Sequence, residues 1–157
     1  MKKNDVSYLN EDGTKKFNYR VALLAVSDNK ILLQKSEKDN YYSLIGGRVQ
    51  LFEDSEQAIK REVKEETGIL LKSSEIKLIS VVENFFTFNK TDFHEILFIY
   101  KTNSAELAAK DNFATLDKFD VFNKWFDTDE LQNMDVRPEF IKKSYANDKL
   151  INLIIKG

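Results

Sequence analysis

GGRVQLFEDSEQAIKREVKEETGI, residues Gly46–Ile69, places a glycine pair and six carboxylates within one short stretch. Its second half predicts a helix over Glu56–Thr67, because neither proline nor glycine interrupts it. Asp54 or Ser55 can cap the first turn, and Asp54 forms a capping-box pattern with the glutamine three residues later. Gly68 then supplies the left-handed residue that ends many helices. The rest of the chain is expected to form a scaffold that positions this glycine turn and helix.

Three glutamates of the predicted helix, Glu62, Glu65 and Glu66, fall on one side of it, because residues three and four apart are surface neighbours. Like charges at this spacing destabilise a helix by roughly 0.2–0.5 kcal/mol per pair, so a cation is expected at the patch. Mg²⁺ takes oxygen ligands and is commonly bound by one or two carboxylates together with substrate phosphates. The alternative is an ordinary solvated acidic face.

A long gapped pattern surrounds these glutamates. If each fixed identity has a background of roughly 5–7%, the whole pattern arises by chance on the order of once in 10⁸ starting points. Its fixed residues are Gly47, Glu53, Arg61, Glu62, Glu65, Glu66 and Gly68, with aliphatic residues at Val63 and Ile69. The pattern resembles the signature of the Nudix hydrolases, also called MutT-like proteins, with no departure at any fixed position.

This resemblance implies a fold and an activity. The fold is expected to be α+β, a Nudix-type α/β/α sandwich with a central mixed β-sheet. The activity is that of a metal-dependent pyrophosphohydrolase, which cleaves a nucleoside diphosphate linked to another moiety, as in a nucleoside triphosphate, ADP-ribose or a nucleotide sugar. Mg²⁺ is the expected cofactor, with Mn²⁺ as an alternative. Many relatives are dimers, so the resemblance allows a homodimer.

Carried over position by position, the resemblance makes Glu62, Glu65 and Glu66 metal ligands, with the carbonyl of Gly47 as a further ligand. Divalent metals can neutralise charge on phosphoryl oxygens and acidify a bound water. A glutamate left uncoordinated could accept the proton of the attacking water, and Glu62 or Glu65 is expected in this role.

Arg61 is expected to be structural, because the resemblance suggests that it pairs with Glu53 and fixes the preceding loop against the helix. The fork of an arginine suits a carboxylate partner that binds at two points. Since Arg61 lies about 100° around the helix from Glu62, it is not expected to bridge to that neighbour. Direct contact of Arg61 with phosphate is the alternative. Arg61 and Glu53 complete the expected catalytic set.

Substrate contacts are expected from residues outside the helix. A nucleobase can stack on an aromatic ring. The resemblance also implies that a further catalytic or metal carboxylate can lie on the strands or loops after the helix, with Glu95 favoured over Glu83 and Glu106, whereas an ordinary solvated or hydrogen-bonded glutamate is the favoured alternative for each. His94, the single histidine, is expected to be structural. The expected substrate-binding residues are Glu95, Phe85, Tyr42 and Arg48.

Apolar runs and turn signals predict strands along the rest of the chain. They are expected at residues 17–26, 31–35, 41–45, 76–88, 94–101 and 119–126, while residues 150–155 are expected either to form a strand or simply to pack against the core. Pro138 suits the first turn of a helix over Glu139–Asn147, and a short helix is expected after Asp127. Residues 1–16 are expected to form a loose end or a short edge hairpin, whereas residues 102–117 read as a loop with a helical turn.

Composition narrows the classes of function. The length and the 42% hydrophobic content predict a single domain over residues 1–157. The 24 basic and 26 acidic residues are scattered and give a net charge of −2, so a small-molecule nucleotide is the expected partner and a polynucleotide is not. Cysteine is absent, which excludes disulfides and thiolate metal sites. No apolar run could cross a bilayer and no signal peptide is visible, so a cytoplasmic protein without a membrane partner is expected.

Two other functions compete with hydrolysis. A non-catalytic regulator that binds a nucleotide on the same fold usually has eroded catalytic glutamates, whereas all of them are present here. The other competitor is a purely structural acidic helix in an unrelated domain. In that case, Mg²⁺ or Mn²⁺ should fail to raise the melting temperature.

Overall fold

The computed structural model describes residues 3–146 and 148–157. Its helical elements, with η marking 3₁₀ helices, are α1 (Ser55–Thr67), η1 (Ser73–Glu75), α2 (Ala105–Ala108), η2 (Thr128–Asn133) and α3 (Ile141–Ser144). Its strands are β1 (Ser7–Leu9), β2 (Lys15–Ser27), β3 (Lys30–Ser36), β4 (Ile45–Arg48), β5 (Ile76–Phe88), β6 (Thr91–Thr102), β7 (Phe113–Ala114), β8 (Val121–Asp127) and β9 (Ile151–Lys156).

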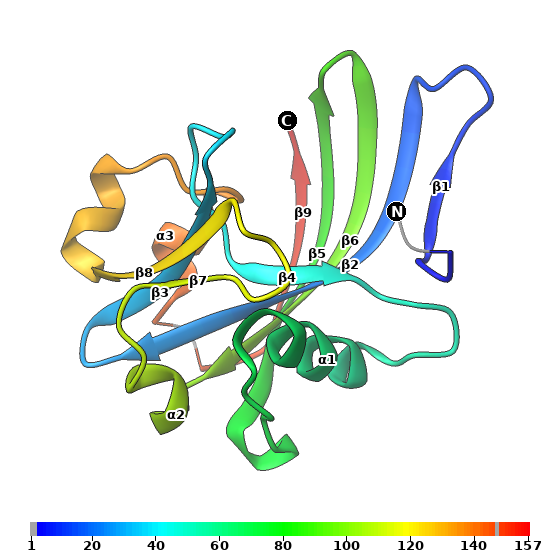
Figure 1. Ribbon diagram of the computed structural model, residues 1–157. Coiled ribbons are helices and arrows are strands. Elements are labelled where there is room, and N and C mark those ends of the chain that lie inside the picture. Colours follow the sequence, from blue (N-terminus) through cyan, green and yellow to red (C-terminus); the bar gives the residue numbers. More distant parts are fainter. Residues whose placement is uncertain (1–2, 147) are drawn as a thin grey trace.

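The strands form one mixed sheet around β2 (Figure 1). The order along the sheet is β7-β8-β3-β2-β6-β5-β9, and β1 and β4 also pair with β2. β2 runs parallel to β6 and β5 runs parallel to β9, while the other paired strands are antiparallel. The central mixed sheet expected from the resemblance is therefore confirmed.

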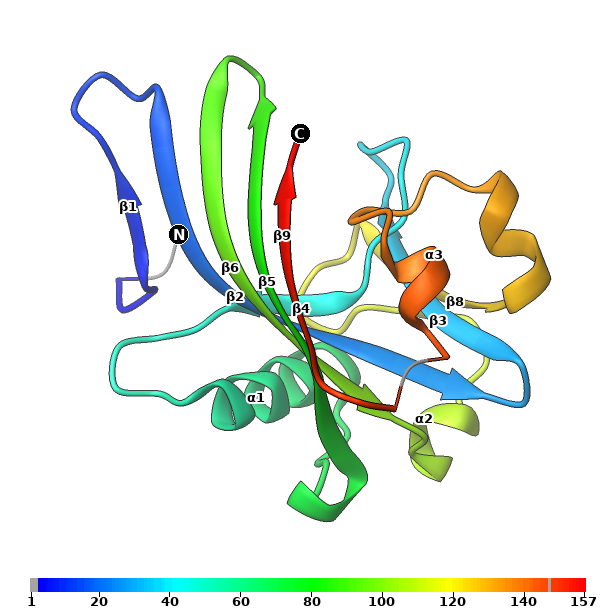
Figure 2. The ribbon, with the colours of Figure 1, turned by 180° about the vertical axis from the view of Figure 1, so that it is seen from behind.

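Alternate residues of β2 face opposite layers of the molecule, as the two-residue period of a strand requires. Val21 and Leu23 pack in one apolar cluster with Val63 of α1. Leu24 packs in a second cluster with Ile141 of α3. The sheet thus lies between α1 and α3, and Figure 2 shows α3 beside β3 and β8. This arrangement confirms the expected α/β/α sandwich.

α1 begins and ends where its sequence predicts. Asp54 accepts a hydrogen bond from the backbone N–H of Gln57 at 2.8 Å, and the Gln57 side chain accepts one from the backbone N–H of Asp54 at 3.0 Å. Gly68 ends the helix in the left-handed region, with φ at 79°. Ile59 and Val63 are fully buried and dock the helix on the sheet. Caps at both ends and one apolar face therefore fix the helix.

The strand predicted at residues 41–45 lies instead at Ile45–Arg48, so the glycine pair forms the strand and does not follow it. Gly46 pairs with Ala22 of β2. A Cβ at Gly46 would lie 2.2 Å from the carbonyl oxygen of Val21 in β2. Only glycine permits this close approach, and a prediction from apolar alternation takes no account of it.

Three further predictions concern the ends of the chain and its least regular segment. Residues 3–16 include β1, which pairs with β2 as a hairpin, so the second of the two alternatives expected there is confirmed. α3 is shorter than the predicted helix, whose last residue, Asn147, lies outside the described residues. The segment 102–117 contains α2 and the short strand β7. Within residues 3–146 and 148–157, no helix has the length and apolar character that crossing a membrane requires.

Candidate active site

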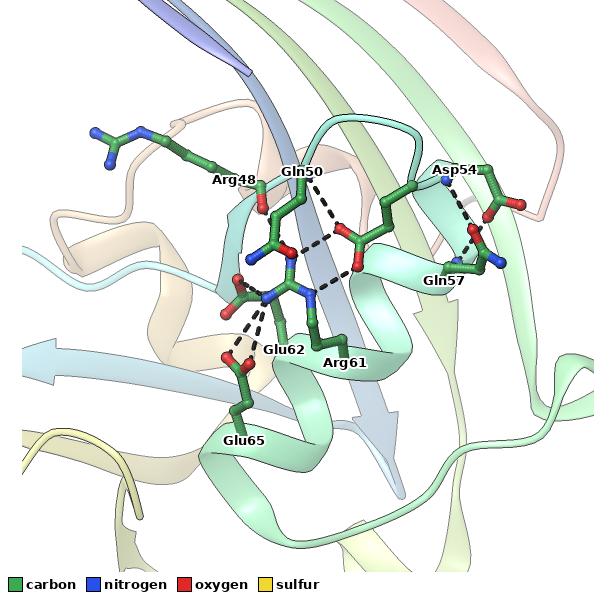
Figure 3. Close-up of polar contacts among 8 residues, drawn as sticks. Arg48, Gln50, Asp54, Gln57, Arg61, Glu62 and Glu65 are labelled. Atoms are coloured by element: carbon green, nitrogen blue, oxygen red, sulfur yellow. Dashed lines mark hydrogen bonds and ion pairs between the residues drawn. The ribbon is translucent and has the colours of Figure 1, made fainter. Parts of the chain in front are cut away.

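Arg61 of α1 ties the loop before the helix to the helix itself (Figure 3). Its Nε lies 2.7 Å from Oε2 of Glu53, and its Nη2 donates to Oε1 of Glu53 at 2.9 Å. Nη2 also donates to the carbonyl oxygen of Arg48 at 3.0 Å, and the backbone N–H of Gln50 donates to Glu53 at 3.1 Å. The expected two-point pairing of Arg61 with Glu53 is therefore present.

The expectation that Arg61 does not bridge to its neighbour is wrong. Nη1 of Arg61 donates to Oε1 of Glu62 at 2.9 Å and lies 3.5 Å from both carboxylate oxygens of Glu65. Glu53 holds Nε and Nη2, so the planar guanidinium directs Nη1 across the helix towards Glu62. The side chain of Arg61 is long enough to reach Glu62 although the two Cα atoms point in different directions around the helix. The hydrogen bond to Glu53 raises the pKa of Arg61 above its ordinary value, despite burial, and Glu62 adds to the rise.

Gly47 and Glu62 lie against each other. A Cβ at Gly47 would lie 2.2 Å from Oε1 of Glu62, so a larger residue would displace that carboxylate. Glu62 is buried, with 7% of its surface exposed. Two of the predicted metal ligands, one on β4 and one on α1, are thus neighbours.

Glu66 is fully buried, and neither of its carboxylate oxygens accepts a hydrogen bond within the described residues. Nζ of Lys118 forms an ion pair with Oε1 at 3.6 Å. Burial raises the pKa of Glu66 from 4.5 to about 8; Lys118 opposes this rise and the charge of Glu62 adds to it. Glu62 and Glu66 are therefore not part of a solvated acidic face. Glu65 is the most exposed of the three glutamates, with 31% of its side chain accessible.

The chemistry of this donor set fits a hard divalent cation. Glu62, Glu65, Glu66 and the Gly47 carbonyl offer oxygen only, and the Glu66 oxygens lack the hydrogen bonds that normally offset burial of a carboxylate. No cluster of three histidine or acidic side chains already forms a closed metal cage in the described parts of the chain. Mg²⁺ does not need one, because it usually keeps waters and takes one or two carboxylates plus substrate phosphates.

A pocket of about 270 Å³ adjoins Gly47 and Glu62. Its lining residues are Asp5, Arg20, Gly46, Gly47, Arg48, Glu62, Asp117 and Lys118. Arg48, predicted as a substrate contact, is among them. Sequence reasoning missed Arg20 and Lys118. Arg20 is a charged residue inside an apolar strand, which could have marked it, whereas Lys118 approaches α1 only through the tertiary fold.

The other predicted substrate contacts are not brought together in this pocket. Glu95 is buried, is not among the residues that line this pocket, and accepts a hydrogen bond from Nδ2 of Asn18 at 2.9 Å. Phe85 stacks on His94 with ring centroids 4.3 Å apart and lines a separate cavity of about 430 Å³. Tyr42 packs on Phe126 in the core at 5.0 Å. Neither ring is among the described residues that line the pocket with Gly47.

Comparison with known proteins agrees with this geometry. The family model described as NUDIX domain matches residues 16–147. An ADP-ribose pyrophosphatase from Methanocaldococcus jannaschii is 34% identical over 99 residues, which cover 61% of this chain and 57% of that protein. The chain therefore matches little more than half the length of this curated relative.

Two solved structures share the fold. The MutT protein from Bacillus halodurans is 19% identical and superimposes with a TM-score of 0.68 over 88% of this chain and 89% of its own. The MutT NUDIX hydrolase from Burkholderia pseudomallei is 24% identical, with a TM-score of 0.65 over 83% of this chain and 98% of its own. The family match spans most of the chain, and the motif that led to the resemblance forms the site. The chain belongs to the Nudix family.

Proposed function

We propose that this protein is a divalent-metal-dependent hydrolase that cleaves the phosphoric anhydride of a nucleoside diphosphate linked to another moiety. The observation that carries the proposal is the burial of Glu66 without hydrogen-bond donors, beside Glu62 and its neighbour Gly47. A buried carboxylate with no such donors is costly unless a cation accompanies it. Lys118 at 3.6 Å offsets part of this cost.

The residues that would hold the metal are Glu62, Glu65 and Glu66, with the carbonyl of Gly47. When bound, Mg²⁺ or Mn²⁺ supplies charge neutralisation at the phosphoryl oxygens and a more acidic water. Arg61 and Glu53 are assigned as positioning residues, because they hold the loop before α1 and two of the glutamates in a fixed arrangement.

We assign the proton-accepting role to Glu65 in preference to Glu62. Arg61 donates a 2.9 Å hydrogen bond to Glu62, so one oxygen of that carboxylate is already engaged. Arg61 is farther from Glu65, at 3.5 Å, and more of the Glu65 side chain is accessible to a substrate and its water. A general base needs such access to the proton that it removes.

The substrate is drawn from small nucleotides. The similar Methanocaldococcus jannaschii protein is named as an ADP-ribose pyrophosphatase, which makes ADP-ribose the first compound to test. Nucleoside triphosphates, a nucleotide sugar and a dinucleoside polyphosphate complete a panel in which only the group beyond the diphosphate varies.

The test is product release from this panel with Mg²⁺, with Mn²⁺ and with a chelator. Hydrolysis of at least one compound, lost with the chelator, supports the proposal. Glu66→Gln should lose turnover, while Glu56→Gln, which changes a partly exposed glutamate of the same helix paired with Lys60, should retain it. Binding of a nucleotide by the folded protein without any turnover would instead identify a non-catalytic nucleotide-binding protein.

A further inference from the structure

Two arginines face each other across the pairing of β2 with β4. Arg20 and Arg48 are direct partners in this antiparallel pair, and both line the pocket beside Glu62. Like charges placed directly opposite each other destabilise a strand pair. Glu95 lies 3.9 Å from Arg20 and Asp5 lies 3.8 Å from Arg48, which offsets part of this repulsion, and an anion that both side chains contact would offset more of it.

The pocket has an acidic side and a basic side, separated by β4. Successive residues of a strand point to opposite faces, and a Cβ at Gly47 would meet Glu62. Figure 3 shows the guanidinium of Arg48 directed away from Arg61, although the Arg48 carbonyl oxygen accepts a hydrogen bond from Arg61. A ligand seated at Glu62 would thus reach Arg20 and Arg48 only by extending past β4.

Buried polar contacts hold both arginines in place. Asn18, with 1% of its surface exposed, accepts a hydrogen bond from Nε of Arg48 at 3.1 Å and donates to Oε2 of Glu95 at 2.9 Å. The same Glu95 oxygen lies 3.9 Å from Nη1 of Arg20, and Nη1 of Arg48 lies 3.8 Å from Asp5. A guanidinium has five N–H donors, so these contacts orient the arginines and leave donors for a ligand.

We infer that Arg20 and Arg48 form an anion-binding pair that recognises a further phosphate of the substrate, beyond the diphosphate that is cleaved. The inference rests on the proposed hydrolase function, because it assigns the basic side of the same pocket. It selects, within the proposed substrates, nucleotides that carry an additional phosphate group. That group can be the terminal phosphate of a nucleoside triphosphate or a phosphate monoester on a ribose.

The experiment compares kcat/KM within two substrate pairs that differ by one phosphate. One pair is ADP-ribose and ADP-ribose 2′-phosphate, and the other is a nucleoside diphosphate and its triphosphate. The phosphate-bearing member of at least one pair should be preferred, and the pair that shows the preference identifies the source of the phosphate. Arg20→Ala should reduce this preference roughly 10–100-fold, mainly through KM, because charge-assisted hydrogen bonds are lost.

Two further variants sharpen the comparison. Arg48→Lys keeps the charge but loses the fork and its contact with Asn18, so it should lose part of the preference. Arg137→Ala is the matched control, because Arg137 is half exposed and pairs with Asp135 outside the pocket lining. No preference in the unaltered protein, or equal losses on both members of each pair, overturns the inference.

A binding measurement separates this inference from the proposed function. If no compound is hydrolysed, the hydrolase proposal fails, but the arginine pair can still be tested by calorimetry with inorganic triphosphate and pyrophosphate and the metal-free protein. Triphosphate should bind more tightly than pyrophosphate, and Arg20→Ala should abolish the difference. Equal affinities in the unaltered protein would refute the anion-binding pair.

Discussion

Replacing Glu66 with glutamine removes the charge of the buried carboxyl and keeps its shape. Below about pH 4.5 this carboxyl is protonated in both the folded and the unfolded chain, so its ionisation makes no contribution to stability. Between about pH 4.5 and pH 8 the unfolded chain releases the proton and the folded chain keeps it. The free energy of unfolding therefore falls as the pH rises through this window.

The magnitude follows from the two pKa values. At about 1.4 kcal/mol per pH unit, the loss accumulates to on the order of 3–5 kcal/mol above pH 8. Glu66→Gln cannot ionise, so it should match the unaltered protein near pH 4.5 and become more stable by this amount at pH 8.5. The control is Glu56→Gln, which changes a partly exposed glutamate of the same helix.

Urea unfolding across this pH range, in the presence of a chelator, measures the effect. Mg²⁺ should then raise the melting temperature of the unaltered protein at pH 8.5 and leave that of Glu66→Gln nearly unchanged, because a ligand stabilises only the state that binds it. A constant difference in unfolding free energy between the two proteins at every pH would refute the reasoning, since it would mean that Glu66 ionises as an ordinary exposed carboxylate does.

Four further substitutions test other parts of the site. Gly47→Ala should lower kcat/KM by about 10²-fold with little change in melting temperature, because the added Cβ meets the movable carboxylate end of Glu62. Gly46→Ala should instead lower the melting temperature, because the added Cβ meets the backbone of β2. Arg61→Lys loses the two-point contact with Glu53 and should cost about 2–3 kcal/mol in urea unfolding; an unchanged free energy would make that contact dispensable. Asp54→Ala removes the helix cap and should cost about 1 kcal/mol by the same measurement, with KM unaltered.

Local signals were enough to predict α1 and much of the sheet. The Asp54 cap, the glycine stop and the buried stripe of Ile59 and Val63 depend on residues within one or two helical turns of each other. The pairing of Arg61 with Glu53 also spans only eight residues, although it was expected from the family resemblance. These features could be predicted because neighbours in sequence determine them.

Features that depend on strand register or on distant loops were not predictable. The spacing of the glutamates indicated a shared acidic patch, but the burial of Glu66 depends on a segment far along the chain. The backbone N–H of Leu116 donates to the carbonyl oxygen of Glu66 at 3.0 Å, and Lys118 then reaches its carboxylate. Likewise, Arg20 and Arg48 face each other only because of the register of β2 against β4. The strand predicted at residues 41–45 did not include Arg48, so this pairing could not be predicted from it.

Each side of β4 holds charged groups in an energetically unfavourable arrangement, and the two arrangements differ in the sign of the charge. This difference explains how one pocket could both bind a metal and select a substrate. On the α1 side, Glu66 is buried without hydrogen bonds, which is unfavourable until a cation arrives. On the other side, Arg20 and Arg48 face each other with only Glu95 and Asp5 to offset their repulsion, and a bound anion would offset more of it. Different contacts hold the two sides, so changes on the arginine side should alter substrate preference while the pH-dependent stability set by Glu66 persists. Strong non-additivity between Arg20→Ala and Glu66→Gln in unfolding free energy would show that the two sides are one coupled network.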